Sequence, residues 1–111
     1  HIPSKMTKGM IKVSVLYPNG DGHTFDLKYY TETHMPMVGA LIGDAMKGGA
    51  MESGLGGPGN TPPAYLIMSH MYFETVEAFE ASFGPNAEKI MGDIPNFTNT
   101  QPVVQISEVL G

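Results

Sequence analysis

The chain has 111 residues, of which 41% are hydrophobic, and carries a formal net charge of −5. This length accommodates one domain, and the hydrophobic fraction excludes a disordered chain. The six Lys and Arg residues are scattered, so the chain lacks the basic patch of a nucleic-acid binder or of a protein that docks on anionic membranes. No apolar run approaches the roughly 20 residues that span a bilayer. We therefore expect a small soluble domain without nucleic-acid or membrane partners.

The chain contains no cysteine, which excludes disulfides, thiolate metal sites and a cysteine nucleophile. The first residues also lack the apolar stretch of a secretory signal, so we expect a cytoplasmic location. We interpret residues 10–111 as a single domain. Residues 1–9 are interpreted as an N-terminal segment that is disordered or left over from expression cloning.

Hydrophobic periodicity predicts four strands and two principal helical regions. In chain order these are a strand over residues 10–17, a helix over 25–33 continued by a short piece over 37–42, a glycine-rich strand over 45–54, a strand over 64–73, a helix over 76–83 with a further turn over 86–91, and a strand over 102–110. This β-α-β-β-α-β order is the split βαβ, or ferredoxin-like, motif. The predicted fold class is therefore α+β with a four-stranded antiparallel sheet.

The first helix carries the strongest local signals. Thr24 or Asp26 can cap its start by accepting from a free amide of the first turn. Pro36 disfavours helical geometry at the residue before it, so we expect a break or kink between His34 and Pro36. Gly43 is expected to end the second piece.

Both faces of the predicted sheet are apolar, although two helices can cover only one. Met10 and Leu16 lie opposite the Ile and Val residues of the first strand, and the strand over residues 64–73 is apolar on both sides. A solvated sheet face is ordinarily polar. Because a symmetric copy covers such a face most economically, the sequence predicts a homodimer.

Two other sequence patterns bear on a cofactor or metal site, and neither supports one. Residues 54–59 match G-x-G-x-x-G, but a dinucleotide site requires this motif to open a helix. Here residues 60–63, Asn-Thr-Pro-Pro, follow and lead into a strand, which favours a plain loop. The four histidines show no metal-ligand spacing, so we expect no metal.

The segment Phe25-Asp26-Leu27-Lys28-Tyr29-Tyr30-Thr31-Glu32-Thr33-His34-Met35-Pro36 resembles the first-helix signature of the EthD family, with an aromatic start, an aromatic pair four residues on and His-x-Pro. Residues 92–98 before the last strand resemble the family as well, and with the element order the resemblance covers residues 10–109. It implies a dimeric α/β barrel, in which two sheets face each other with the helices outside. Relatives of this broad fold include cofactor-free monooxygenases, muconolactone isomerases, polyketide-tailoring enzymes and haem-handling enzymes. The fold does not choose among these activities.

His34 is the first candidate catalytic residue. It lies one helical turn after Tyr30, so the two side chains share a face. A histidine can move protons near neutral pH, and a neighbouring phenol can orient it or donate to a developing oxyanion. The resemblance places the matching histidine beside a pocket. The alternative is a structural histidine that anchors the chain at Pro36.

Further candidates are polar or aromatic residues that could shape a pocket. His70 and Tyr72 would be polar groups in an apolar cavity if their face of the strand lines the barrel; otherwise His70 is a core histidine. The remaining candidate substrate-binding residues are Phe25, Tyr29 and Phe97, and the tyrosine pair at 29 and 30 can equally be aromatic core. Asp93 could be a general base, but we favour a cap for the turn before Pro95.

The resulting functional prediction is a cofactor-independent enzyme of monooxygenase, isomerase or polyketide-tailoring type. Its small-molecule substrate would be an apolar oxygenated or aromatic metabolite, with His34 as acid/base and Tyr30 orienting it or donating. A non-catalytic carrier that uses the same cavity is the alternative. A haem protein with His34 or His70 as axial ligand is a third possibility.

Overall fold

The computed structural model describes residues 7–111, so residues 1–6 of the predicted N-terminal segment lie outside the described residues. From Thr7 the chain leads directly into the sheet. The Gly9 amide donates to the Val109 carbonyl (2.8 Å), and the Val109 amide donates to the Met10 carbonyl (2.8 Å).

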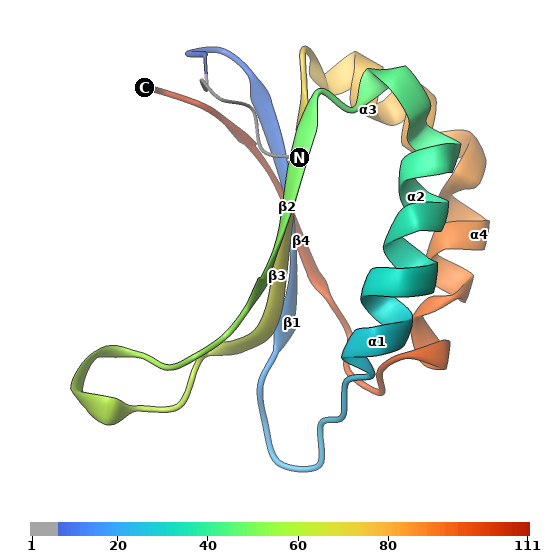
Figure 1. Cartoon of the computed structure of the whole chain (residues 1–111). Helices are drawn as coiled ribbons and strands as arrows, with labels where there is room; N and C mark the ends of the chain where they lie inside the picture. Colours follow the sequence, from blue (N-terminus) through green and yellow to red (C-terminus); the bar gives the residue numbers. More distant parts are fainter. Residues whose placement is uncertain (1–6) are drawn as a thin grey trace.

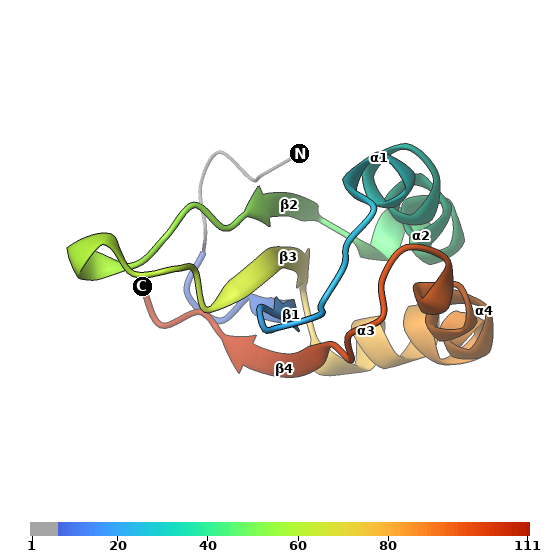
Figure 2. The same ribbon diagram turned by 90° about the horizontal axis from the view of Figure 1, so that it is seen from below.

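The structure confirms the predicted α+β class and its element order. The strands are β1 (Ile11–Pro18), β2 (Gly48–Ser53), β3 (Tyr65–Phe73) and β4 (Val103–Glu108); the helices are α1 (Leu27–Tyr29), α2 (Met35–Ile42), α3 (Val76–Phe83) and α4 (Ala87–Gly92). The four strands form one sheet in the order β2-β3-β1-β4, and each neighbouring pair is antiparallel. All the helices lie on one side of this sheet, with α1 and α2 beside α3 and α4 (Figures 1 and 2).

Of the break or kink predicted between His34 and Pro36, the break is absent. His34 (φ −65°, ψ −56°) and Met35 (φ −68°, ψ −36°) are both helical. Because Pro36 has no N–H and its ring crowds the carbonyl four residues earlier, the chain widens locally instead. Residues 30–34 form a π-helical turn in which the Met35 amide donates to the Tyr30 carbonyl, five residues back. One continuous helical run thus joins α1 to α2.

The helix begins later than predicted, at Leu27. Asp26 is its cap, since Asp26 Oδ1 accepts from the Tyr29 amide at 3.0 Å. Phe25 stays outside the helix and forms an isolated β-bridge with Thr98. As predicted, α2 ends at Gly43, which adopts φ +68°.

The glycine-rich strand is shorter than the predicted range and ends at Ser53. The match to G-x-G-x-x-G lies in the loop joining β2 to β3, with a 3₁₀ turn at Pro58–Asn60. The loop leads into a strand, as predicted, and opens no α-helix.

The core lies between the sheet and the helices, in two clusters of buried side chains. The larger contains Val13, Val38, Met71, Phe73 and Phe79 among others. The smaller is aromatic and surrounds Tyr17, Tyr30 and Phe97. None of the helices within residues 7–111 combines the length and apolarity needed to cross a bilayer.

Candidate functional site

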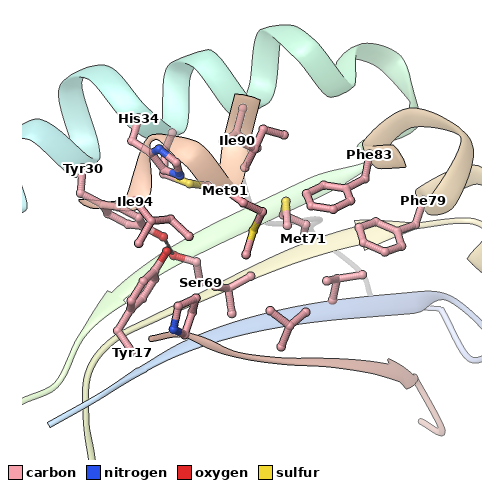
Figure 3. Close-up of a pocket in the computed structure, with 16 residues that line it drawn as sticks. Tyr17, Tyr30, His34, Ser69, Met71, Phe79, Phe83, Ile90, Met91 and Ile94 are labelled. Carbon is pink, nitrogen blue, oxygen red and sulfur yellow. Dashed lines mark hydrogen bonds between the residues drawn. The ribbon is translucent and has the colours of Figure 1, made fainter. Parts of the chain in front are cut away.

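A cavity of about 330 Å³ lies between the sheet and the helices, along the inner face of β1 and β3. Its wall is almost entirely apolar. The four polar side chains, Tyr17, Tyr30, His34 and Ser69, gather at one end, whereas Phe79 and Phe83 line the other (Figure 3). Met91 of α4 and Val104 of β4 also border the cavity and are 43% and 49% exposed, so they lie toward its opening.

His34 reaches this cavity from the π-helical turn. Its side chain is buried, with the ring stacked on Tyr30 (centroids 5.6 Å apart, 17° between planes) and tilted against Phe97 (centroids 4.5 Å apart). The widened turn keeps Tyr30 and His34 on the same side of the helix, toward the sheet. Such π-turns recur at functional sites.

Asp93 fixes the orientation of the His34 ring. The His34 Nδ1 atom donates to Asp93 Oδ2 at 2.9 Å, and the Tyr29 hydroxyl (2.8 Å) and the Asn96 amide (2.8 Å) donate to Asp93 Oδ1. Asp93 takes the N-cap position of the turn before Pro95, as favoured, but its side chain accepts no capping hydrogen bond from a backbone amide of that turn. It holds the histidine instead.

The hydrogen bonds around Asp93 favour its charged form. Burial by itself raises the pKa of the Asp93 carboxyl, but donation from His34, Asn96 and Tyr29 outweighs it and leaves the pKa below its ordinary value of 3.8. The same hydrogen bond to Asp93 raises the pKa of the Tyr29 phenol, which therefore remains a donor. Asp93 is an anion at neutral pH.

With Nδ1 committed to Asp93, Nε2 is the His34 atom free to meet a ligand. Among the described residues, no buried side-chain nitrogen or oxygen is sealed off without a partner. Because His34 lines the cavity and its recorded hydrogen bond uses only Nδ1, Nε2 opens into the cavity. In the neutral tautomer with a proton on Nδ1, this Nε2 atom carries a lone pair.

Tyr30 bonds Ser69 rather than His34. Its hydroxyl and the Ser69 hydroxyl share a hydrogen bond of 2.5 Å, and both side chains are about 1% exposed. Burial raises the pKa of Tyr30 to about 12, so the phenol is neutral in the cavity. The contact of Tyr30 with His34 is ring stacking, and the hydrogen bond that orients His34 comes from Asp93.

The predicted aromatic residues Phe25, Tyr29 and Phe97 do not line the cavity. Phe25 and Phe97 border a shallow surface hollow of about 400 Å³ and pack behind His34 and Tyr30. Tyr29 lies behind Asp93, to which it donates. These residues support the His34 ring from outside the cavity.

The predicted residues His70 and Tyr72 point away from the cavity. Residues alternate between faces along β3, and Ser69 and Met71 face the helices, so His70 and Tyr72 lie on the opposite face. There His70 bonds Ser14 (Nδ1 to Oγ, 2.9 Å) and Glu52 (Nε2 to Oε1, 3.0 Å) across three neighbouring strands. His70 and Tyr72 therefore do not line this cavity, and their role in a barrel formed by two facing sheets stays a prediction.

Sequence reasoning named Asp93 but missed its contact with His34, because the two residues lie 59 positions apart. It missed two further residues of the site. Ser69 and Tyr17 were visible only as strand residues. Within residues 7–111, no group of three or more His, Asp or Glu side chains is placed to hold a metal ion.

The fold and the site define a class of protein. It is a small α+β domain in which a buried histidine, held by a partly exposed aspartate, lies at the polar end of an apolar cavity between helices and sheet. The chain belongs to the EthD family, because the EthD domain matches residues 22–101.

Two solved structures are similar to this chain. An EthD-like protein from Ralstonia eutropha JMP134 is 42% identical with a TM-score of 0.87, over 95% of this chain and 96% of that one. An ethyl tert-butyl ether D (EthD) family protein from Bacillus halodurans C-125 is 18% identical with a TM-score of 0.64, over 91% of this chain and 99% of that one, a likeness of fold. No curated protein matches the sequence.

Proposed function

We propose that this protein is a small cofactor-independent enzyme that moves a proton on an apolar oxygenated or aromatic metabolite. His34 Nε2 is the acid/base. One observation carries the proposal: Nδ1 of His34 is held by the Asp93 carboxylate, while Nε2 opens into an apolar cavity.

The surroundings of His34 suit proton transfer. The Asp93 anion keeps the proton on Nδ1, so Nε2 is available as a base, and it stabilises the imidazolium that forms when Nε2 accepts a proton. The apolar wall offers water no hydrogen-bond partners apart from the polar end, which strengthens this electrostatic support and limits side reactions. Positioned acid/base groups of this kind contribute about 10²- to 10⁴-fold to a rate.

The step is redox-neutral. A C–H bond beside a carbonyl breaks, its proton passes to Nε2, and the electron pair moves into the carbonyl to form an enolate. Return of the proton to another carbon completes an isomerisation. A cofactor-independent monooxygenase would begin with the same transfer of a proton from carbon to Nε2 and would also consume dioxygen.

Solvent exchange of a ketone tests the proposal. The bicyclic ketone 2-tetralone is incubated with the protein in deuterium oxide, and loss of its α-proton signals is followed by NMR. The wild type is expected to accelerate exchange over buffer, and His34→Gln is expected to remove at least about 100-fold of that acceleration.

His23→Gln is the matched control, because His23 is exposed and only donates to a backbone carbonyl in its own turn. Acceleration that survives His34→Gln, or is lost equally in His23→Gln, contradicts the assignment. Binding of the ketone without exchange would instead support the carrier alternative. A shifted Soret band on adding haem would support a haem protein.

We also propose that the protein forms a homodimer through the outer face of its sheet. On that face Leu16 of β1 lies between Met68 of β3 and Val103 of β4 in register. Val103 is 49% exposed. No helix covers this face in Figure 1, and solvent-exposed apolar rows of this kind favour association.

A further inference from the structure

Tyr17 is a buried phenol at the polar end of the cavity. The proposed proton transfer does not use its hydroxyl. The residue lies on the inner face of β1 and is 2% exposed. Its ring is held edge-on by Phe25 (5.1 Å), Tyr30 (5.8 Å) and Phe97 (5.8 Å between centroids). Its position is therefore set by packing, and its hydroxyl lies near Ser69 and the end of Tyr30 (Figure 3).

The Tyr17 hydroxyl has no hydrogen-bond partner among the described residues. Burial and the neighbouring Tyr30 phenol raise its pKa, and no hydrogen bond contributes, whereas Tyr30 is hydrogen-bonded to Ser69. Because no buried oxygen among residues 7–111 is sealed off without a partner, the Tyr17 hydroxyl must open into the cavity that Tyr17 lines.

A hydroxyl without a protein hydrogen bond adds little to the stability of the fold, so the Tyr17 hydroxyl has no evident internal role. Tyr30 and Ser69 share one hydrogen bond, which uses the hydrogen of one hydroxyl and a lone pair of the other. The Tyr17 hydroxyl and His34 Nε2 are the polar cavity-lining side-chain groups that form no hydrogen bond to another described residue, and both lie at the same end of an otherwise apolar cavity.

We propose that Tyr17 donates a hydrogen bond to the oxygen of the substrate, and that this substrate is an apolar molecule of about two fused rings with a carbonyl or hydroxyl at one end. An engineered apolar cavity of about 150 Å³ binds benzene. The cavity here, at about 330 Å³, is roughly twice as large. The ring system lies against Met71, Phe79 and Phe83, and the oxygen points toward Tyr17.

The oxygen site at Tyr17 rests on the proposed function, because His34 is the base that acts beside the oxygen held by Tyr17. When the proton leaves carbon, negative charge develops on that oxygen. A neutral phenol in a dry site then stabilises it more strongly than it stabilises the ground-state carbonyl.

A matched pair of ligands tests the role of Tyr17. Dissociation constants of 2-tetralone and of tetralin, its hydrocarbon counterpart, are measured by calorimetry for wild type, Tyr17→Phe and Tyr65→Phe. Tyr17→Phe is expected to weaken 2-tetralone binding about 3- to 10-fold and to leave tetralin within about 2-fold. The control Tyr65→Phe lies on β3 but does not line the cavity, and is expected to change neither.

Equal weakening of both ligands, no weakening of either, or no binding of 2-tetralone by the wild type would overturn the proposal. Thermal unfolding provides a second check. Tyr17→Phe is expected to keep or raise Tm, whereas Tyr30→Phe, which strands the Ser69 hydroxyl, is expected to lower it. A Tm loss in Tyr17→Phe as large as in Tyr30→Phe would mean that the Tyr17 hydroxyl has an internal partner, and would also overturn it.

The two proposals fail separately. Tyr17-dependent binding of 2-tetralone without His34-dependent proton exchange would sink the proposed activity and leave the oxygen site in place. Proton exchange that depends on His34 but not on Tyr17, with 2-tetralone bound equally by wild type and Tyr17→Phe, would contradict the oxygen site and leave the proposed activity in place.

Discussion

At the scale of single residues, the site depends on one carboxylate with three donors. Asp93 collects hydrogen bonds from His34, Tyr29 and Asn96, each 2.8 or 2.9 Å long. A carboxylate so surrounded both fixes a ring orientation and stabilises the fold in its charged form. Replacing it should therefore affect stability in a way that depends on pH.

Asp93→Asn is expected to lower the free energy of unfolding by about 1–3 kcal/mol near neutral pH, since hydrogen bonds to a charged group are lost. The folded-state pKa of Asp93 lies below its ordinary 3.8, so its contribution is fully present above that pH and is lost as pH falls through the lower folded value. The stability gap between wild type and Asp93→Asn should therefore shrink below about pH 3.8.

Urea unfolding across the acid range measures this gap. Asp44→Asn, a substitution of an exposed carboxylate, is the control and should track the wild type. A gap that stays constant, or widens on acidification, would mean that Asp93 is not held as an anion in the folded protein.

At the scale of secondary-structure elements, local backbone geometry decides what the sequence can tolerate. The helix accommodates Pro36 by widening into a π-helical turn, and this keeps Tyr30 and His34 facing the sheet.

The β2–β3 hairpin, in contrast, contains a position that cannot accommodate a side chain without a shift of the backbone. A Cβ on Gly54 would lie 2.2 Å from the carbonyl oxygen of Tyr65, a residue paired with Pro18 of β1.

Two glycine substitutions should therefore have opposite signs. Gly54→Ala is expected to cost about 1–3 kcal/mol, because the paired strand must shift. Gly39→Ala in α2, where a Cβ meets no other atom within 4 Å, is expected to add about 0.5–1 kcal/mol through helix propensity. Chemical denaturation of both variants checks this, and similar effects at the two positions would show that the hairpin backbone relaxes freely.

At the scale of the whole molecule, the two faces of the sheet have separate roles. The inner face forms one wall of the cavity that His34 also lines, and the outer face carries the apolar row of Leu16, Met68 and Val103. Because these faces are back to back on the same strands, association on one side does not block the cavity opening on the other. Both proposals can hold in one molecule.

Analytical ultracentrifugation tests the dimer. The wild type is expected to sediment at twice the 11.9 kDa chain mass, and Met68→Glu to shift it toward the monomer, because burying an unpaired charge in an apolar interface is costly. Leu27→Glu is the matched control, since Leu27 is 47% exposed on the helical side and should leave the mass unchanged. A wild-type monomer, or a dimer unaffected by Met68→Glu, would contradict the proposal.

Local sequence signals determined the elements of this fold. Strand alternation, the cap at Asp26 and the stop at Gly43 each act over a few residues, so the sequence alone predicted the element order and the fold class. It also identified His34 and Tyr30 as neighbours, because they lie one turn apart on a single helix. Boundaries were less accurate, since tertiary pairing drew Phe25 out of the helix toward Thr98.

Only the tertiary structure decided which side chains meet at the site. Asp93 reaches His34 across 59 positions, Tyr30 reaches Ser69 across 39, and both contacts depend on how the helices pack on the sheet. The same packing decided that Ser69 faces the cavity while His70, its neighbour in sequence, faces away. Alternation along a strand shows which residues share a face but not which face the helices cover, because that choice is made by the connections between distant elements.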